Sequence, residues 1–217
     1  MNVILLAGGQ GTRMEDPKPK PLVKAKGKPI IAYQLNYFLN SGVINKIILA
    51  LGFRADEIID FVNKNYADKP IEFSIEESPL GTGGAIKQAL KKADSEFVIA
   101  LNCDDLTDID LNELSKIKEN TICVTNPRLP FGRVVDDKGY ARFEEKPLLK
   151  DMWVSLGWYL LNRKEMLDII PDKASIEYDV YPKINLRMYK HTGYWQPLNS
   201  KKDIIEFENK DLPEAFK

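Results

Sequence analysis

A glycine-rich segment that directly follows a short apolar run constrains this chain more than any other feature. The apolar run Val3–Leu6 is followed by three glycines within four residues, Gly8, Gly9 and Gly11. Glycine lets the backbone turn tightly and brings its N–H groups close to a ligand. Successive N–H groups in such a loop form an anion-binding concavity. The pattern predicts a phosphate-binding loop at the end of a strand, and a plain surface turn is the alternative.

Cations follow the glycines, and prolines stiffen the segment that carries them. Arg13 comes two residues after Gly11, and Lys18 and Lys20 alternate with prolines. Fixed cations beside an anion-binding loop suit a polyphosphate. Two better-known phosphate motifs do not fit. The dinucleotide fingerprint needs glycine where Met14 stands, and the P-loop pattern occurs nowhere in the chain.

The same stretch resembles the signature of the sugar-1-phosphate nucleotidylyltransferases. The family pattern L-A-G-G-x-G-T-R-L, followed by P-K-P-L and G-K-P, corresponds to Leu6–Met14, Pro19–Leu22 and Gly27–Pro29. The loop between the first two segments is shorter than most members have. The resemblance implies a Rossmann-like nucleotidyltransferase fold with an inserted antiparallel sugar-binding lobe. The most similar members are guanylyltransferases for mannose and heptose 1-phosphate and glucose-1-phosphate cytidylyltransferases.

Apolar runs alternate with helical patterns through the first half of the chain. Strands are expected at 3–6, 46–51, 71–75 and 96–102, and helices at 29–40, 56–65 and 82–92. This alternation predicts an α/β fold with a doubly wound, mostly parallel sheet. The second half contains turn-separated strand patterns at 121–126, 133–136, 140–144, 153–160, 186–189 and 192–195. A hairpin turn is expected at Asp137–Gly139, and a final helix with a capping box from Ser200 to Asp203.

Length and composition describe one globular domain. The 217 residues predict a single domain over 1–217, with a nucleotide-binding half (1–108) and a sugar-binding half (109–217). A net charge of −1 gives no field that favours nucleic acid or an anionic membrane. The sequence contains no apolar run long enough to span a membrane and no pattern of a signal peptide. We therefore expect a cytoplasmic enzyme without nucleic-acid or membrane partners, which could form a homo-oligomer.

Cysteine and histidine contribute little to the expected chemistry. Cys103 and Cys123 are too few for a disulfide or zinc framework, which fits a reducing compartment. His191 is the one histidine, and we expect it on the surface of a strand.

The third expected strand ends in a second glycine-bearing turn. Ligands of open parallel sheets bind outside the carboxyl ends of the strands. Glu76 and Glu77 precede the run Pro79–Ala85, whose helix start could present N–H donors while the carboxylates contact a base. The alternative is a helix start capped by Thr82. The resemblance assigns nucleotide binding to residues of both turns, namely Leu6, Ala7, Gly8, Gly9, Gly11, Thr12, Glu76, Pro79, Gly81 and Thr82.

The fourth expected strand ends in Asn102, Cys103, Asp104 and Asp105. Paired carboxylates at close range oppose each other's ionisation unless a cation is near, and one carboxylate plus phosphate oxygens is a usual magnesium site. Two solvated loop acids are the alternative. In the resembling family the motif here is G-D, and its aspartate binds Mg²⁺. Asp104 matches that aspartate, and Cys103 replaces the glycine.

The sugar half carries weaker motifs. Phe131–Val135 and Phe143–Pro147 resemble the family segments Y-G-V-V and F-x-E-K-P. The resemblance assigns sugar-phosphate binding to Gly132, Glu145, Lys146 and Val154. A surface salt bridge is the alternative for Glu145 and Lys146. The largest departure is Pro197, which stands where the family usually has a second metal-binding aspartate, while Asn199 matches the aspartate of the cytidylyltransferases.

The resemblance implies transfer of a nucleoside monophosphate from an NTP to a hexose or heptose 1-phosphate, with release of pyrophosphate. Arg13 would hold the pyrophosphate, Lys20 the α-phosphate, and Asp104 a Mg²⁺ ion. GTP is slightly favoured, but signals for CTP, dTTP or UTP users also occur. Another phosphorylated alcohol as acceptor is a second possibility. A catalytically inactive regulator that binds nucleotide sugars is a third, because of Pro197.

Overall fold

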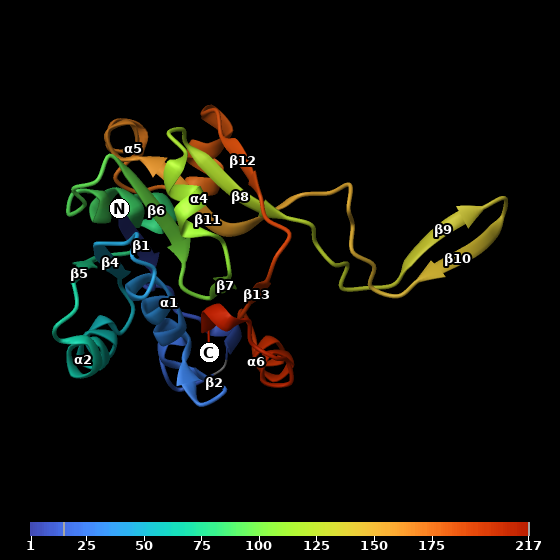
Figure 1. The fold of residues 1–217 in the computed structure, drawn as a ribbon, viewed down its shortest axis with the longest axis horizontal. Coiled ribbons are helices and arrows are strands. Elements are labelled where there is room, and N and C mark those ends of the chain that lie inside the picture. The colour runs from blue at the N-terminus through green and yellow to red at the C-terminus, as the bar shows by residue number, and fades with distance from the viewer. Residues whose placement is uncertain (15, 217) are drawn as a thin grey trace.

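A seven-stranded sheet forms the centre of the fold in the computed structural model, which describes residues 1–14 and 16–216 (Figure 1). In spatial order the strands are β12 (Arg187–Lys190), β8 (Thr121–Thr125), β11 (Val154–Asn162), β6 (Phe97–Asn102), β1 (Asn2–Leu6), β4 (Lys46–Leu51) and β5 (Ile71–Ile75). Strand β11 runs antiparallel to β6 and β8, and the other neighbouring pairs are parallel. The predicted doubly wound, mostly parallel sheet is therefore confirmed.

The central strands are apolar throughout because both faces of the sheet are covered. Val3 and Leu5 of β1 pack on one face with α1 (Ile30–Leu39), α2 (Ala55–Tyr66) and α4 (Leu111–Lys116). Ile4 packs on the other face with α3 (Gly81–Leu90) and α5 (Arg163–Ile169). Successive side chains of a strand point to opposite faces, so the short run Val3–Leu6 contributes to both cores.

The first three helices and the last one were predicted within a few residues of their observed bounds. In α6 (Lys201–Glu208), Ser200 and Asp203 form the expected capping box. The short helices α4 and α5 were not predicted. Further helical turns are Thr12–Met14, Lys20–Leu22, Ile176–Val180, Tyr181–Lys183 and Glu214–Phe216.

Three two-stranded sheets complete the fold: β2 (Lys24–Ala25) with β3 (Lys28–Pro29), β7 (Asp105–Thr107) with β13 (Trp195–Pro197), and β9 (Arg133–Asp137) with β10 (Tyr140–Glu144). The strand expected at 192–195 was wrong in its bounds, because β13 begins where that range ends. His191 does not lie on the surface as expected. It is 9 % exposed, and its Nε2 atom lies 2.9 Å from Oδ1 of Asp108.

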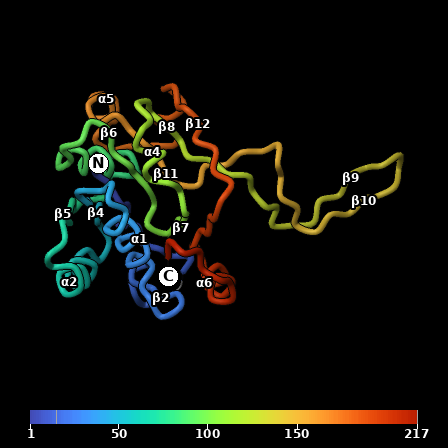
Figure 2. The backbone as a smooth tube through the Cα atoms, in the orientation of Figure 1, coloured from blue at the N-terminus to red at the C-terminus, as the bar shows by residue number. Residues whose placement is uncertain are grey.

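The hairpin β9–β10 is the antiparallel insertion that the sequence predicted. The turn at Asp137–Gly139 is confirmed, since Lys138 and Gly139 both have positive φ and Asp136 accepts a hydrogen bond from the Gly139 N–H. Residues 127–152, which we call the arm, leave the main sheet after β8 and return to it at β11. Figures 1 and 2 show the arm projecting far from the rest of the molecule.

The segment after the first glycine turn is fixed by the C-terminal part of the chain. Met14, Val23 and Tyr33 form a buried cluster with Phe207 of α6 and Phe216. Figure 1 shows the C-terminus beside α1 and β2. This third core holds the proline-rich segment with Lys20 against the body of the protein. Over the described residues, no helix has both the length and the apolar character needed to cross a membrane.

Gly157 explains an irregularity in β11. The register with β8 shifts between Ser155 and Tyr159, and Gly157 has a φ of +79°. A Cβ atom at this position would lie 2.2 Å from Oδ2 of Asp105. Gly42, which follows α1, has a similar φ of +68°, but a Cβ atom there would have no neighbouring atom within 4 Å.

We expect Gly157→Ala to lower the free energy of unfolding by about 3 kcal/mol or more, because it adds a clash to the cost of a left-handed conformation. Gly42→Ala should lower it by only about 1–2 kcal/mol, since the conformation alone is unfavourable there. Urea denaturation of both variants measures the difference. Equal losses would show that the contact between position 157 and Asp105 is unimportant.

Candidate active site

A pocket of about 690 Å³ opens at the carboxyl ends of β1, β4, β5 and β6. It is lined by the turns that follow these strands, by the start of α3, and by Lys20 and Pro21. The predicted nucleotide residues that line it are Leu6, Ala7, Gly8, Gly9, Gly11, Glu76, Pro79, Gly81 and Thr82. The sheet therefore brings both glycine-bearing turns to one pocket, as expected for this edge of a parallel sheet.

The three glycines of the first turn have different roles. A Cβ atom on Gly8 would lie 2.8 Å from the backbone nitrogen of Gly52, and one on Gly11 would lie 2.7 Å from Cβ of Lys20. Gly11 also has a φ of +62°. These two glycines are required by contacts within the protein. Gly9 has no atom within 4 Å of such a Cβ, so the space beside it is open to a ligand.

Thr12 and Arg13 lie outside the residues that line the pocket. They belong to the helical turn Thr12–Met14, and both side chains are exposed. Their predicted roles in phosphate binding remain predictions.

Lys20 and Asp104 form an ion pair at the pocket, although they come from motifs 84 positions apart. Their side chains are only 15 % and 14 % exposed. The Lys20 ammonium also donates a hydrogen bond of 3.0 Å to Oδ1 of Asn199. Two of the three predicted catalytic residues are thus in direct contact, and Asn199 joins them from the C-terminal segment.

The two adjacent carboxylates at the end of β6 have different surroundings. Asp104 lines the pocket, whereas Asp105 is buried and accepts hydrogen bonds from Asn102 Nδ2 (3.1 Å) and Trp195 Nε1 (3.3 Å). Burial, and then the negative charge of Asp104, raise the pKa of Asp105 to about 7. Asp104 is therefore the carboxylate of this pair that is available to a ligand in the pocket.

The alternative interpretation, in which Thr82 caps the start of the helix, is wrong. Helix α3 begins after Leu80, and no side chain caps it. The Thr82 hydroxyl instead donates to Glu177 and accepts from the Ile176 N–H. Glu76 holds the start of the helix, because its Oε2 atom accepts a hydrogen bond of 3.1 Å from the Leu80 N–H.

The glycines at the start of α3 are explained by packing within the protein. A Cβ atom on Gly81 would lie 2.4 Å from the carbonyl oxygen of Ala174, and one on Gly84 would lie 2.4 Å from that of Asp172. A Cβ atom on Gly83 would lie 3.1 Å from Cβ and the carbonyl oxygen of Ala174, a less severe contact. The helix start is pressed against the segment 172–176, and only Gly81 of these three glycines lines the pocket.

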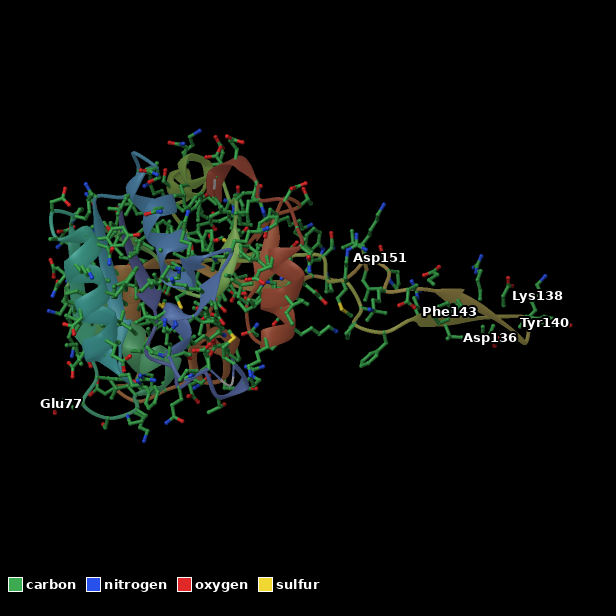
Figure 3. The ribbon with its side chains drawn as sticks, turned by 90° about the horizontal axis from the view of Figure 1, so that it is seen from below. Glu77, Asp136, Lys138, Tyr140, Phe143 and Asp151 are labelled. Atoms are coloured by element: carbon green, nitrogen blue, oxygen red, sulfur yellow. The ribbon has the colours of Figure 1, made fainter. Side chains whose placement is uncertain are left out.

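The predicted sugar-phosphate residues are not assembled with the pocket of the same chain. Gly132, Glu145 and Lys146 lie on the arm, and Val154 is the first residue of β11. Figure 3 shows Phe143 and the arm tip at the opposite end of the molecule from Glu77. The glycine at position 132 is explained by packing within the arm, because a Cβ atom there would collide with the ring of Phe143.

Several pocket residues were not among the predicted site residues. Gly52 and Phe53 follow β4, and Gln88 lies on α3. Gly52 and Phe53 could have been indicated by their position directly after a buried strand, whereas Gln88 lies two turns into α3. The sequence analysis noted Asn199 as the match to the cytidylyltransferase aspartate, but its contact with Lys20, 179 positions away, is not indicated by any local pattern.

A model of the Nucleotidyl transferase family matches residues 2–212 of the chain. The D-glycero-alpha-D-manno-heptose 1-phosphate guanylyltransferase of Campylobacter jejuni is 32 % identical over 220 residues, which cover 95 % of this chain and 98 % of that protein. Mannose-1-phosphate guanyltransferase 2 of Candida glabrata is 32 % identical over 230 residues, and the match covers 94 % of this chain but only 63 % of that protein.

Two solved structures are similar in fold over nearly the whole chain. The structure of HddC from Yersinia pseudotuberculosis complexed with GMP-PN has a TM-score of 0.77 and 28 % identity, and it covers 95 % of this chain and 97 % of that chain. A putative glucose-1-phosphate thymidylyltransferase from Bacillus anthracis has a TM-score of 0.72 at 17 % identity, covering 99 % and 98 % of the two chains, which shows a shared fold.

We expect Gly9→Ala to raise the Kd for GTP at least about tenfold without changing the melting temperature, because the added methyl group meets no protein atom but occupies open space in the loop. Gly8→Ala is the matched variant, and it should lower the melting temperature through its contact with Gly52. Calorimetric titration and thermal unfolding measure the two effects. Unchanged GTP binding by Gly9→Ala would contradict a phosphate-binding role for this loop.

Proposed function

Because the chain belongs to the nucleotidyl transferase family, we propose that it transfers GMP from GTP to a hexose or heptose 1-phosphate and releases pyrophosphate. The observation that carries this proposal is the contact between Lys20 and Asp104 beside an open glycine turn. The named activities of the Campylobacter and Candida relatives support GTP as the nucleotide and a heptose or mannose phosphate as the acceptor.

The reaction needs charge neutralisation and alignment more than proton transfer. A phosphate oxygen of the acceptor forms a bond to the α-phosphorus of GTP, and the bond from that phosphorus to the pyrophosphate oxygen breaks. The attacking group is already an anion at neutral pH, so no general base is required. Positioning and electrostatic stabilisation then account for most of the rate.

Lys20 is the residue best placed to act on the α-phosphate. Its ammonium is held near the glycine turn by the packing of its stem against Gly11, and it lies between Asp104 and Asn199. A largely desolvated ammonium stabilises developing negative charge more strongly than an exposed one. The predicted contact of Arg13 with pyrophosphate would add a second cation from the same segment.

The donor atoms at Asp104 fit a magnesium ion. Mg²⁺ is usually held by one or two carboxylates together with substrate phosphates and water, and Asp104 presents a carboxylate to the pocket beside the cation that would contact the α-phosphate. When bound, Mg²⁺ would neutralise charge on the phosphate oxygens. Pro197 stands in place of the family's second aspartate and provides no carboxylate. The side chain from this segment that contacts Lys20 is the neutral amide of Asn199.

Glu76 offers an acceptor for a guanine base. Guanine presents N–H donors on its N1 and N2 edge, and a carboxylate accepts hydrogen bonds from both. One carboxylate oxygen of Glu76 is used by the Leu80 N–H, and the residue lines the pocket beside Gly52. This arrangement favours guanine over bases that present acceptors at that edge.

Pyrophosphate release measured with a panel of nucleoside triphosphates and sugar 1-phosphates tests the proposal. We expect the fastest release with GTP and a heptose or mannose 1-phosphate. Lys20→Ala should lower kcat by about 100-fold or more while the melting temperature changes little. Lys18→Ala is the control, since that exposed lysine lies in the same proline-rich segment but outside the pocket lining. Tight nucleotide binding without pyrophosphate release from any pair would contradict the proposal.

We expect Glu76→Gln to reduce the preference for GTP over UTP or dTTP by about 10- to 100-fold, because the amide replaces an acceptor with a donor. The preference is measured as a ratio of kcat/KM values. Glu72→Gln is the control, since Glu72 lies on β5 outside the pocket lining, whereas Glu77, at the outer edge of the molecule in Figure 3, still lines the pocket. An unchanged ratio in Glu76→Gln would exclude this residue from base selection.

A further inference from the structure

Phe53 presents an exposed aromatic ring at the pocket. It follows the end of β4, is 45 % exposed, and lines the pocket. The other large apolar residues of comparable exposure in the described ranges 1–14 and 16–216 lie outside this lining. Scattered apolar residues on a protein surface need no explanation, but aromatic side chains in a pocket commonly contact its ligand. A ligand in this pocket is therefore the expected cover for the ring.

The turn that carries Phe53 is fixed by hydrogen bonds to two other segments. The Phe53 N–H donates to the Gly8 carbonyl (3.0 Å). Arg54 has a φ of +54°, a left-handed conformation that is uncommon for a residue with a side chain. Its guanidinium donates to the Pro17 carbonyl and pairs with Glu57. Conformations of this kind persist where surrounding contacts hold them, and they concentrate at ligand sites. The backbone beside the ring is thus held in place before a ligand binds.

Phe53 lies next to the contact between Gly52 and Glu76. A Cβ atom on Gly52 would lie 2.4 Å from Oε1 of Glu76, so this carboxylate lies against the backbone of the residue before Phe53. A Cβ atom on Gly8 would lie 2.8 Å from the backbone nitrogen of Gly52. The turn at Gly52 and Phe53 therefore touches both the first glycine turn and the carboxylate of Glu76.

The neighbouring side chains of Phe53 and Glu76 suit two different parts of one base. A carboxylate accepts hydrogen bonds from N–H groups in the plane of a base, whereas an aromatic ring packs on its face. Every base has such a face, so stacking is available to all of them. The face of an aromatic ring carries partial negative charge and does not attract a phosphate. Of the groups in a nucleoside triphosphate, the base is the one that the ring of Phe53 suits.

We propose that Phe53 stacks on the face of the nucleobase whose edge Glu76 contacts. This inference rests on the proposed function, and it adds a second contact to the base. Stacking fixes the plane of the base, so that its edge meets the carboxylate of Glu76. Phe53 then contributes affinity for any base, while Glu76 contributes the choice between bases.

We expect Phe53→Ala to raise the Kd for GTP about 5- to 100-fold, because the stacking contact is lost. Phe53→Tyr and Phe53→Trp keep an aromatic ring and should bind GTP within about threefold of the wild type. Ile75→Ala is the matched control, since Ile75 is 47 % exposed and directly precedes Glu76 but lies outside the pocket lining. Calorimetric titration with GTP and Mg²⁺, without an acceptor, measures these constants. If Phe53→Ala bound GTP as tightly as Ile75→Ala, the proposal would be overturned.

Inorganic tripolyphosphate separates stacking from a supporting role of the ring in the turn. It carries the charges of a triphosphate but no base, so the wild type and Phe53→Ala should bind it with the same Kd. A rise in this Kd as large as the rise for GTP would show that the ring maintains the glycine turn through the contact with Gly8. That result would also overturn the proposal.

The fluorescence of an added indole reports stacking directly. In Phe53→Trp, GTP should cause a saturable decrease in emission, because the indole comes to lie against the base. Ile75→Trp adds an indole outside the pocket lining and should show only the response of the wild type, whose three tryptophans both variants retain. Equal responses of the two variants at saturating GTP would contradict stacking at position 53.

These outcomes are separate from a failure of the proposed function. If the wild type bound GTP but released no pyrophosphate from any substrate pair, the proposed reaction would be wrong, while the binding constants of the Phe53 variants would still decide whether this ring stacks on the base. If the wild type were active and Phe53→Ala bound GTP unchanged, the reaction would stand and the stacking contact would be wrong.

Discussion

The contact between Lys20 and Asp104 is the interaction on which the candidate site depends. It joins the proline-rich segment after the first glycine turn to the end of β6, and it is largely shielded from solvent. Opposite charges attract more strongly where water is excluded, but removing them from water is costly. A pair of this kind is well suited to a site that receives polyphosphate, because the phosphate and a metal ion can each take one partner.

The two halves of the site are built in physically different ways. The nucleotide half is fixed by the sheet, whose buried strands end at one edge and direct their turns into one pocket. The residues predicted for the sugar phosphate lie mostly on the arm, which has no core of its own and whose two legs are joined by hydrogen bonds at its base. Rigid placement suits the recognition of a triphosphate.

Features that depend on local patterns could be predicted from the sequence. Features that are determined by contacts between residues far apart in the chain could not. The strands β4 and β5 and the helix α1 were found because apolar runs and periodicity signal them directly. Helices α4 and α5 have too few turns to show a clear period. The glycines at Gly81 and Gly84 are explained by segment 172–176, some ninety residues later in the chain, which no local pattern reveals. The two legs of the arm are joined at its base by hydrogen bonds such as those from Asn126 to Lys150 and Met152, which lie 24 and 26 positions later in the chain, and the motifs on the arm did not indicate where these residues lie.

A crystal structure with a non-hydrolysable GTP analogue and Mg²⁺ tests most directly whether the Lys20–Asp104 contact is the phosphate site. We predict that the α-phosphate lies beside the backbone of Gly8–Gly11, that the Lys20 ammonium contacts it, and that Asp104 binds the metal. A nucleotide bound elsewhere, with the ion pair between Lys20 and Asp104 intact, would contradict this assignment.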